Sequence, residues 1–248
     1  MPERLETVAQ VMQELGGLAD PRHREKMAYF GIYAPDAFGI RLPHLRALAK
    51  KIGRNHSLAL KLWDTGNHEA RIVAAMIDDP RAVTSAQMES WARDFYSWDI
   101  VDGCCCCVFA FAGPAWRKAV EWSGRKQEFV KRAGFSLMAY LAYKDKSAPD
   151  SKFLPLLGVI RREADDDRNF VKKAVNWALR NIGKRNVRLN RAAIRAAREL
   201  RGMRSRSARW IASDALRELE SEAVQRRLRA KKHKVRFTER SRSTGGAI

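Results

Sequence analysis

The stretch Phe-Val-Lys-Arg-Ala at residues 129–133 recurs as Phe-Val-Lys-Lys-Ala at residues 170–174, an offset of 41 positions. A period of about 40 to 47 residues is typical of solenoids in which each repeat is a pair of antiparallel helices. Trp177 and Trp210 stand in similar local sequences and hint at a third, degenerate copy. The echo therefore predicts a stack of helix pairs.

The rest of the chain agrees with an all-helical fold. Amphipathic segments follow one another, and no window sustains the two-residue alternation of a half-buried strand. Helix starts are indicated by Asn55, by Asn67, by Thr84 with Gln87 as a capping box, and by Pro43 in a first turn. We predict an all-α protein, a right-handed superhelical stack of HEAT-like antiparallel helix pairs with a basic concave face.

Length and composition bound the organisation. The chain has 248 residues, 46% of them hydrophobic, which is enough for a sizeable core. We expect a single HEAT-like domain over residues 1–228 and a basic, disordered tail over residues 229–248. No apolar stretch has the length of a membrane span and no leader is apparent, so we expect a soluble protein in the cytoplasm, nucleoid-associated when bound to DNA.

The charge predicts a polyanionic partner. Lys and Arg number 48 against 28 Asp and Glu, a formal net charge of +20. Residues 185–209 contain nine arginines and one acid, Glu199. Five of the arginines are spaced three or four apart, and on a helix they would form one face able to follow a phosphate backbone: Arg185, Arg188, Arg191, Arg195 and Arg198. The alternative is a merely solvated helix face.

The segment Phe95–Gly103 carries the strongest candidate for chemistry. In a helix that begins after Ser97, Trp98 and Asp102 stand four residues apart and share a face. Asp99 is better explained as a capping or dipole-complementing residue. Asp102 is followed by the apolar stretch 104–111, so its carboxylate needs a partner or a purpose. Its alternative role is an ion pair with an arginine, with Trp98 as a core residue.

A family resemblance rests on three strings in this order: Ser-Trp-Asp-Ile-Val-Asp at 97–102, the helix at 129–133, and Phe-Val-Lys-Lys-Ala-Val-Asn-Trp-Ala-Leu-Arg at 170–180. Together they resemble the AlkD-like DNA alkylation repair glycosylases, from about Met27 to about Leu228. That resemblance implies a HEAT-like superhelix that cradles duplex DNA and removes cationic bases such as 3-methyladenine and 7-methylguanine, acting on a base that is still in the stack.

By position, the resemblance implies Asp102 as the catalytic carboxylate, with Trp98 and Trp177 as aromatic contacts to the deoxyribose. It implies Arg132 and Arg180 as phosphate contacts. The chemistry is consistent, since a fixed carboxylate stabilises the oxocarbenium-like sugar formed when the glycosidic bond breaks. At 4 Å and an effective dielectric near 20 the attraction is about 4 kcal/mol, or roughly a thousandfold in rate. A cationic purine leaves without protonation, so no general acid is needed.

Further basic residues are expected to face DNA from the second helices of the repeats or from the arginine-rich segment. They are Lys131, Lys172, Lys173, Arg185, Arg188 and Arg209. The expected partner is duplex DNA with alkylated bases, bound by a monomer without membrane contact. Two other functions stay open: a non-catalytic module that binds duplex, branched or damaged nucleic acid, and a protein-interaction scaffold of the same fold.

No cofactor and no metal is expected. The four cysteines are the consecutive run Cys104–Cys107, without the two further ligands of a structural zinc site, and they are interpreted as reduced, tightly packed thiols. The string His-Glu-Ala-Arg at 68–71 lacks the second histidine of a zinc protease motif. The acidic triplet at 165–167 is interpreted as the start of the helix that carries Phe170.

Overall fold

The computed structural model describes residues 5–230, and all regular structure within that range is helical, as predicted. The chain divides into two compact units, residues 1–119 and 120–248. The basic tail expected from residue 229 lies outside the described residues, apart from its first two. Between residues 5 and 230, no helix combines the length and the apolar character that crossing a bilayer requires.

The first unit is organised around α5 (His68–Ile77), which packs against α1, α3, α4 and α7. Trp63 of α4 stacks on Trp91 of α6 with ring centroids 4.1 Å apart, and its indole N–H donates to Asp94 at 2.8 Å. The other helices are α1 (Val8–Gly17), α2 (Pro21–Met27), η1 (Ala28–Phe30), α3 (Leu42–Ile52), α4 (His56–Asp64), α6 (Ser85–Arg93), α7 (Trp98–Cys107) and η2 (Phe109–Phe111).

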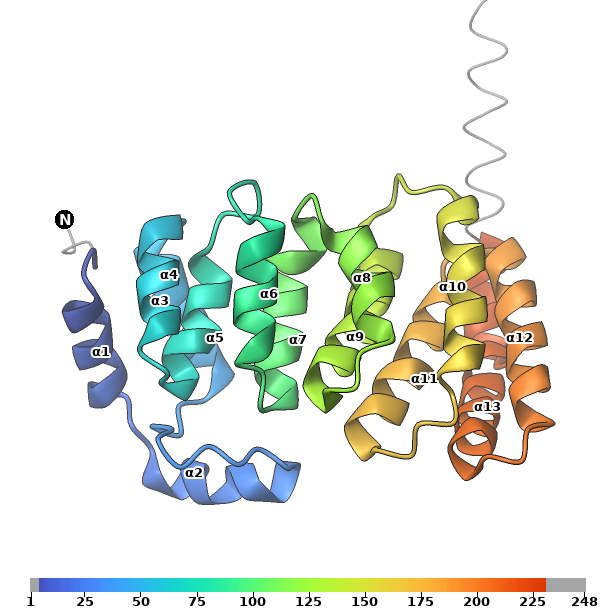
Figure 1. The fold of residues 1–248 in the computed structure, drawn as a ribbon, viewed down its shortest axis with the longest axis horizontal. Coiled ribbons are helices and arrows are strands. Elements are labelled where there is room, and N and C mark those ends of the chain that lie inside the picture. Colours follow the sequence, from blue (N-terminus) through green and yellow to red (C-terminus); the bar gives the residue numbers. More distant parts are fainter. Residues whose placement is uncertain (1–4, 231–248) are drawn as a thin grey trace, which may run out of the picture. The chain divides into compact units, whose positions relative to one another are not determined.

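The second unit has two layers of helices, visible in Figure 1. One layer contains α9, α11 and α13, with the most extensive packing between α9 and α11, and the other contains α10 and α12. Their bounds are α9 (Glu128–Lys144), α10 (Asp150–Arg162), α11 (Asn169–Gly183), α12 (Val187–Arg201) and α13 (Arg206–Leu219). Residues 222–230 are also helical, and α8 (Ala115–Ser123) spans the boundary between the units.

The sequence echo marks equivalent positions in this second unit. The stretches 129–133 and 170–174 form the first turns of α9 and α11. The rings of Phe129 and Phe170 contact each other with centroids 5.6 Å apart, and the guanidinium of Arg132 donates to the Phe170 carbonyl at 2.9 Å. Trp177 lies in the middle of α11 whereas Trp210 lies near the start of α13, so those two residues are not equivalent.

The predicted helix starts are confirmed at Asn55 and Asn67, whose side chains each accept a backbone N–H three residues on at 3.0 Å. The capping box predicted at Thr84 is only half formed. Thr84 accepts the Gln87 N–H at 3.1 Å, but the Gln87 amide donates to the fully buried Asp78 at 2.6 Å instead of returning to the cap. A buried carboxylate competes successfully for the amide because its desolvation must be compensated.

Gly134 allows α9 to approach the end of α8 at backbone distance. A Cβ built at Gly134 would lie 2.9 Å from the Ser123 Cα and from the Trp122 carbonyl carbon, and closer still to the Ser123 nitrogen. These are backbone atoms, which cannot yield as a flexible side-chain end could. The glycine is therefore required by packing.

We expect Gly134→Ala to destabilise the protein by about 1–3 kcal/mol, because it overpacks a backbone contact. Gly158→Ala is the matched control: this exposed glycine of α10 has no atom within 4 Å of an added Cβ, and alanine should stabilise the helix by about 0.5–1 kcal/mol. Urea unfolding of both variants measures the difference. Equal effects on the free energy of unfolding would contradict the packing role of Gly134.

Candidate functional site

Helix α7 presents Trp98 and Asp102 on one face, as their spacing predicts. The helix begins after Ser97, and its opposite face is anchored in the core by Ile100, Val101 and Cys104. Trp98 and Asp102 are both half-buried. A carboxylate and an indole are thus held one turn apart on a rigid, core-anchored helix.

The Trp98 ring is fixed by a bond to a distant segment. Its indole N–H donates to the carbonyl oxygen of Phe30 at 2.9 Å, which joins α7 to the end of η1. Gly31 follows with φ +73°, a left-handed conformation that suits glycine and ends η1. The aromatic side chains of this segment are themselves exposed, Tyr29 at 88% and Phe30 at 58%.

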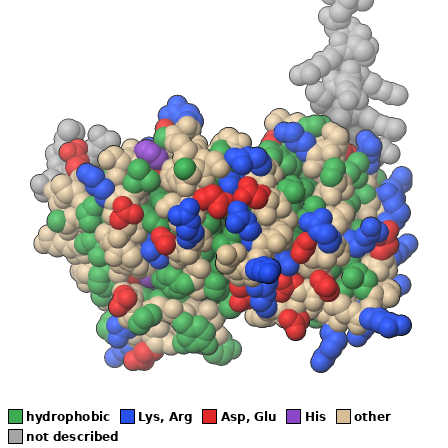
Figure 2. Space-filling view, viewed as in Figure 1, with side chains coloured by type: hydrophobic (Ala, Val, Ile, Leu, Met, Phe, Trp, Pro, Cys, Tyr) green, Lys and Arg blue, Asp and Glu red, His purple; other side chains and the backbone are tan. Residues whose placement is uncertain are grey.

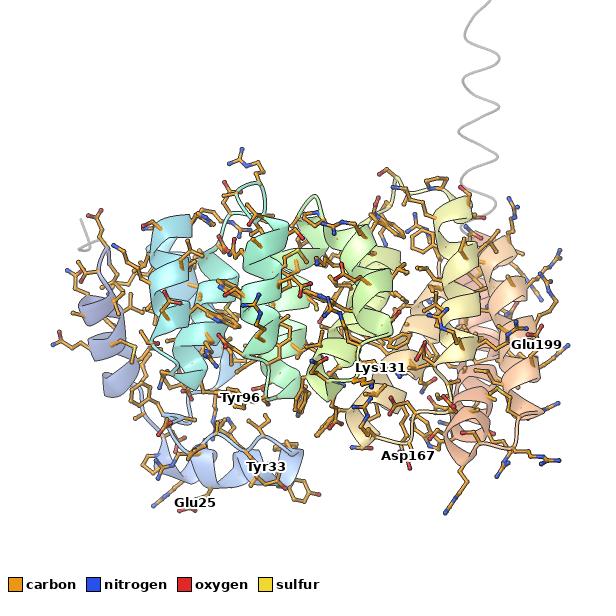
Figure 3. The ribbon with its side chains drawn as sticks, in the orientation of Figure 1. Glu25, Tyr33, Tyr96, Lys131, Asp167 and Glu199 are labelled. Atoms are coloured by element: carbon orange, nitrogen blue, oxygen red, sulfur yellow. The ribbon has the colours of Figure 1, made fainter. Side chains whose placement is uncertain are left out.

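A buried histidine lies beneath the start of α7. His68, the first residue of α5, is 2% exposed, and both of its ring nitrogens have partners. Its Nδ1 lies 2.8 Å from the hydroxyl of Tyr96, and its Nε2 lies 2.9 Å from the Asp99 carboxylate. Tyr96 is labelled in Figure 3. Asp99 also accepts the Ile100 N–H at 3.0 Å and the Ser97 hydroxyl. The network ties α5 to the first turn of α7.

These contacts perturb two pKa values. Burial of Asp99 opposes its ionisation, but hydrogen bonds from His68, Ser97 and Ile100 outweigh it and lower the pKa of the carboxyl below its usual value. Burial, partly offset by Arg71, raises the pKa of Tyr96 to about 12. The sequence predicts Asp99 as a capping or dipole-complementing residue of the helix start, and the hydrogen bond that it accepts from the Ile100 N–H agrees with this. Its contact with His68 is not predicted from the sequence.

Glu69, next to His68, performs a second anchoring role. Its carboxylate, 1% exposed, accepts three backbone N–H groups, from Phe38 at 2.9 Å, Gly39 at 2.7 Å and Ile40 at 3.1 Å. Multiple N–H donors compensate the buried negative charge without a cation. The loop that leads into α3 is thereby fixed to α5, the same helix that holds α7.

We expect Asp99→Asn to cost about 1–3 kcal/mol of stability at pH 7, because buried donors lose an ionised acceptor. Since folding lowers the pKa of Asp99, its ionised form stabilises the native state at pH values above the usual value of 3.8. That contribution disappears as pH falls through the lower native pKa. Urea unfolding of wild type and Asp99→Asn from pH 7 to pH 3 should show the gap narrowing below about pH 4, and a constant gap would contradict it.

The cysteine run fills the C-terminal half of α7. Cys104 and Cys105 are buried, and Cys106 and Cys107 are half-buried. Burial raises the pKa of the Cys104 thiol, and the hydrogen bond to Cys106, together with burial, raises that of Cys107. Thiols with raised pKa values are poor nucleophiles and poor metal ligands. Among residues 5–230, no three His, Cys, Asp or Glu side chains are grouped as a metal site would require.

In the second unit, Trp177 lies half-buried on α11. Its ring meets that of Tyr140 on α9 edge to face, with centroids 4.8 Å apart and an interplanar angle of 83°. Lys173 and Arg180 are four residues before and three after Trp177, so the three side chains share one helix face. An indole flanked by two cations can contact a sugar and its adjoining phosphates.

Several predicted phosphate contacts have partners within the second unit. Lys131, labelled in Figure 3, is buried and lies 2.9 Å from both Glu163 and Asp166. Burial of Asp166 opposes its ionisation, but hydrogen bonds from Arg168 and Lys131 lower its pKa to about 2. Such a pair cannot release its lysine to a phosphate without leaving buried carboxylates uncompensated.

Two of the predicted arginines, Arg132 and Arg180, also have partners within the second unit, but Arg180 keeps one unused donor. Arg132, 7% exposed, donates to the Phe170 carbonyl, and Arg180 lies 2.5 Å from Glu218 and 3.5 Å from Asp214. The Nε of Arg180 is buried without a hydrogen-bond partner among the described residues. A phosphate oxygen that reached Arg180 would gain a donor that folding leaves unused.

Of the other predicted cations, some contact groups of the protein and others are exposed to solvent. Arg185 donates to the carbonyls of Ala142, Lys146 and Ala148, so it fixes the C-terminal end of α9. The Lys172 ammonium lies 5.6 Å from the centre of the Trp210 ring. Three predicted residues are exposed: Lys173, Arg188 and Arg209, the last of which donates to the carbonyls of Met203 and Arg204.

The predicted residues thus fall into two sets. Trp98 and Asp102 belong to the first unit, and the other nine belong to the second. The sequence prediction does not include His68 and Glu69, because the string at 68–71 resembles only part of a zinc protease motif. The available signal was a histidine and a glutamate that open a helix whose other residues, except Arg71, are apolar, so that each needs a buried partner.

Comparison with known proteins places this geometry in context. A family model described as DNA alkylation repair enzyme matches residues 11–219. A solved structure matches with a TM-score of 0.71 and 24% sequence identity, over 86% of this chain and 95% of the other, and it confirms the predicted HEAT-like fold. It is described as belonging to a new family of proteins related to the HEAT-like repeat DNA glycosylases with affinity for branched DNA structures. No curated protein matches.

Proposed function

The chain belongs to the DNA alkylation repair enzyme family, and we propose that it is a DNA glycosylase that excises positively charged alkylated purines. The observation that carries this proposal is the face of α7, where the Trp98 ring and the Asp102 carboxylate stand one turn apart. Asp102 is the proposed catalytic residue. Adducts of the 3-methyladenine and 7-methylguanine type are the proposed substrates.

The proposed chemistry uses charge that develops at the sugar. As the bond from C1′ to the purine nitrogen breaks, its electron pair leaves with the base, and the cationic base becomes neutral. The sugar becomes oxocarbenium-like and is stabilised by the carboxylate of Asp102, which also orients the attacking water. Since the leaving base already carries the positive charge, no proton donor is required for its departure.

The rigid support of α7 fits this role. A carboxylate stabilises a transition state best when it is held in place before the reaction, so that no reorganisation is needed. Core residues fix α7 from one side, and the network of His68 fixes its first turn. Trp98 cannot rotate freely, because its N–H is bonded to Phe30. An indole face toward the cationic sugar would add about 0.5–2 kcal/mol.

The second unit is proposed to bind the DNA through the face of α11. Trp177 is a second aromatic contact to the nucleic acid, and Lys173 and Arg180 supply positive charge beside it. Arg180 is the stronger candidate for a phosphate contact than Arg132, because its Nε lacks a partner among the described residues. We propose that a monomer acts on duplex DNA in this way.

We expect Asp102→Asn to lower the single-turnover rate of 7-methylguanine release by about a thousandfold, which corresponds to about 4 kcal/mol of lost electrostatic stabilisation. The affinity for alkylated duplex should change little, because the carboxylate acts on charge that forms during the reaction. The measurement uses protein in excess over alkylated duplex, with released base quantified over time.

Asp79→Asn is the matched control, since it removes one carboxylate from an exposed ion pair with Arg81 in a loop. Its rate should equal that of wild type. Full activity of Asp102→Asn would remove Asp102 from the mechanism, while a parallel fall of both variants would indicate a general charge effect.

A second candidate function is binding of branched DNA without base release. The solved relative is described as having that affinity, which favours this alternative. Under it, wild-type protein in excess would release no base above background from alkylated duplex, yet would bind a four-way junction more tightly than a linear duplex. Salt would weaken that binding steeply, as expected when phosphates are neutralised.

A further inference from the structure

We propose that the outer face of α12 is a second DNA-binding surface, which holds a duplex segment other than the one bound by the face of α11 that carries Trp177. Arg188, Arg191 and Arg195 define this surface, here called the α12 arginine row. The proposal rests on the proposed function in one respect, namely that the α11 face binds DNA.

The α12 arginine row is regular. Its members are spaced by three and four residues, so their side chains lie on one side of the helix over about 10 Å of its length. All three are exposed. The opposite side of α12 is buried through Leu189 and a run of small residues, which are Ala192, Ala193, Ala196 and Ala197. Figure 2 shows Lys and Arg side chains along the edge that α12 forms in Figure 1.

The row is also uncompensated. Within residues 5–230, none of the three guanidinium groups has a carboxylate at ion-pair distance or a hydrogen bond to the rest of the chain. The acids at its border are occupied by other arginines: Glu220 lies 2.9 Å from Arg198, and Glu199 lies 3.0 Å from Arg161.

In the interior of the same unit, by contrast, cations are bound by groups of the protein. Lys131 is held by two carboxylates, and Arg185 is held by three backbone carbonyls. Those groups must give up a partner to bind a phosphate, whereas the α12 arginine row loses only hydration. A row of available arginines on a rigid helix is the kind of charge that a phosphate backbone recognises.

The row and Trp177 lie on different faces of the second unit. The buried side of α12 packs on α11 and α13, as shown at Gly183, where an added Cβ would lie 2.9 Å from Ala193 of α12 and 2.7 Å from Leu219 of α13. The row therefore points away from α11. Trp177 belongs to the layer that does not contain α12, and it lies on the side of α11 that meets Tyr140 of α9.

One straight duplex does not serve both faces. The DNA duplex is stiff, with a persistence length of about 150 base pairs, and bending a short site by 40–90° costs of order 1–6 kcal/mol. A second duplex segment reaches the row without bending the first. A branched DNA molecule supplies two such segments joined at a point, so the occupant to which the geometry points is the second arm of a branched DNA.

The test replaces the row in the full-length protein with Arg188→Gln, Arg191→Gln and Arg195→Gln together. The control triple is Lys50→Gln, Lys61→Gln and Arg93→Gln, which removes the same charge from exposed positions of the first unit. Binding of a four-way DNA junction and of a linear duplex is measured at several salt concentrations. Thermal unfolding should be nearly unchanged for both triples, because all six side chains are exposed.

We expect the row variant to bind the junction at least tenfold more weakly, with its log–log salt slope smaller by about 2.7, since three phosphate contacts are lost. Its affinity for linear duplex should stay within about twofold of wild type. Unchanged junction binding would overturn the proposal. So would equal loss on junction and duplex, which would make the row part of the first surface, and equal loss in the control triple, which would make the effect one of net charge.

Release of 7-methylguanine from a linear duplex separates this proposal from the proposed function. If wild type and the row variant release base equally while the variant loses junction binding, both proposals stand. If neither releases base while junction binding still depends on the row, the glycosylase proposal fails and the second surface stands. Intact base release with unchanged junction binding overturns the second surface alone.

Discussion

A buried charge needs a partner, and this requirement sorts the ionisable side chains of the second unit into two kinds. In a stack of helix pairs every helix buries one side, so a charged residue near that side must find a counter-charge or a backbone group. Lys131 does so with Glu163 and Asp166, and Arg185 does so with carbonyls at the end of α9. Cations on the outer side of α12 face no such requirement. The +20 charge of the chain therefore overstates the charge available to a ligand, and its location matters more than its sum.

The same requirement explains what the sequence could and could not predict. Helix starts at Asn55 and Asn67, the turn-to-turn relation of Trp98 and Asp102, and the 41-residue repeat depend on neighbours within a few residues or on a regular period. The partners of buried charges depend on residues about 30 or more positions away. No local pattern connects His68 to Asp99 or Arg180 to Glu218. Gln87 shows where prediction from local sequence fails. The capping-box pattern predicts that the Gln87 side chain bonds back to the start of its helix, but its amide donates to the buried Asp78 instead.

The candidate site places an anchoring carboxylate and the proposed catalytic carboxylate three residues apart on one helix. Asp99 and Asp102 are three residues apart on α7, but Asp99 is tied to His68, Ser97 and its own first turn, whereas Asp102 lies on the face of Trp98. The sequence places Asp99 at the helix start by its position, but it does not identify the histidine that makes Asp99 an anchor.

The division between compensated and uncompensated cations also bears on how a DNA repair protein of this fold could select its substrate. Interior pairs keep the helix layers in register and contribute little attraction at a distance, since each positive charge is cancelled within about 3 Å. Exposed arginines attract any phosphate backbone and carry no sequence information. Under the proposed function, a damaged nucleotide is selected at Trp98 and Asp102, and under the proposed second surface, DNA shape is selected by the position of the α12 arginine row. A chain that places such groups on different helices can recognise a lesion and a DNA geometry by separate contacts, each open to change without loss of the other.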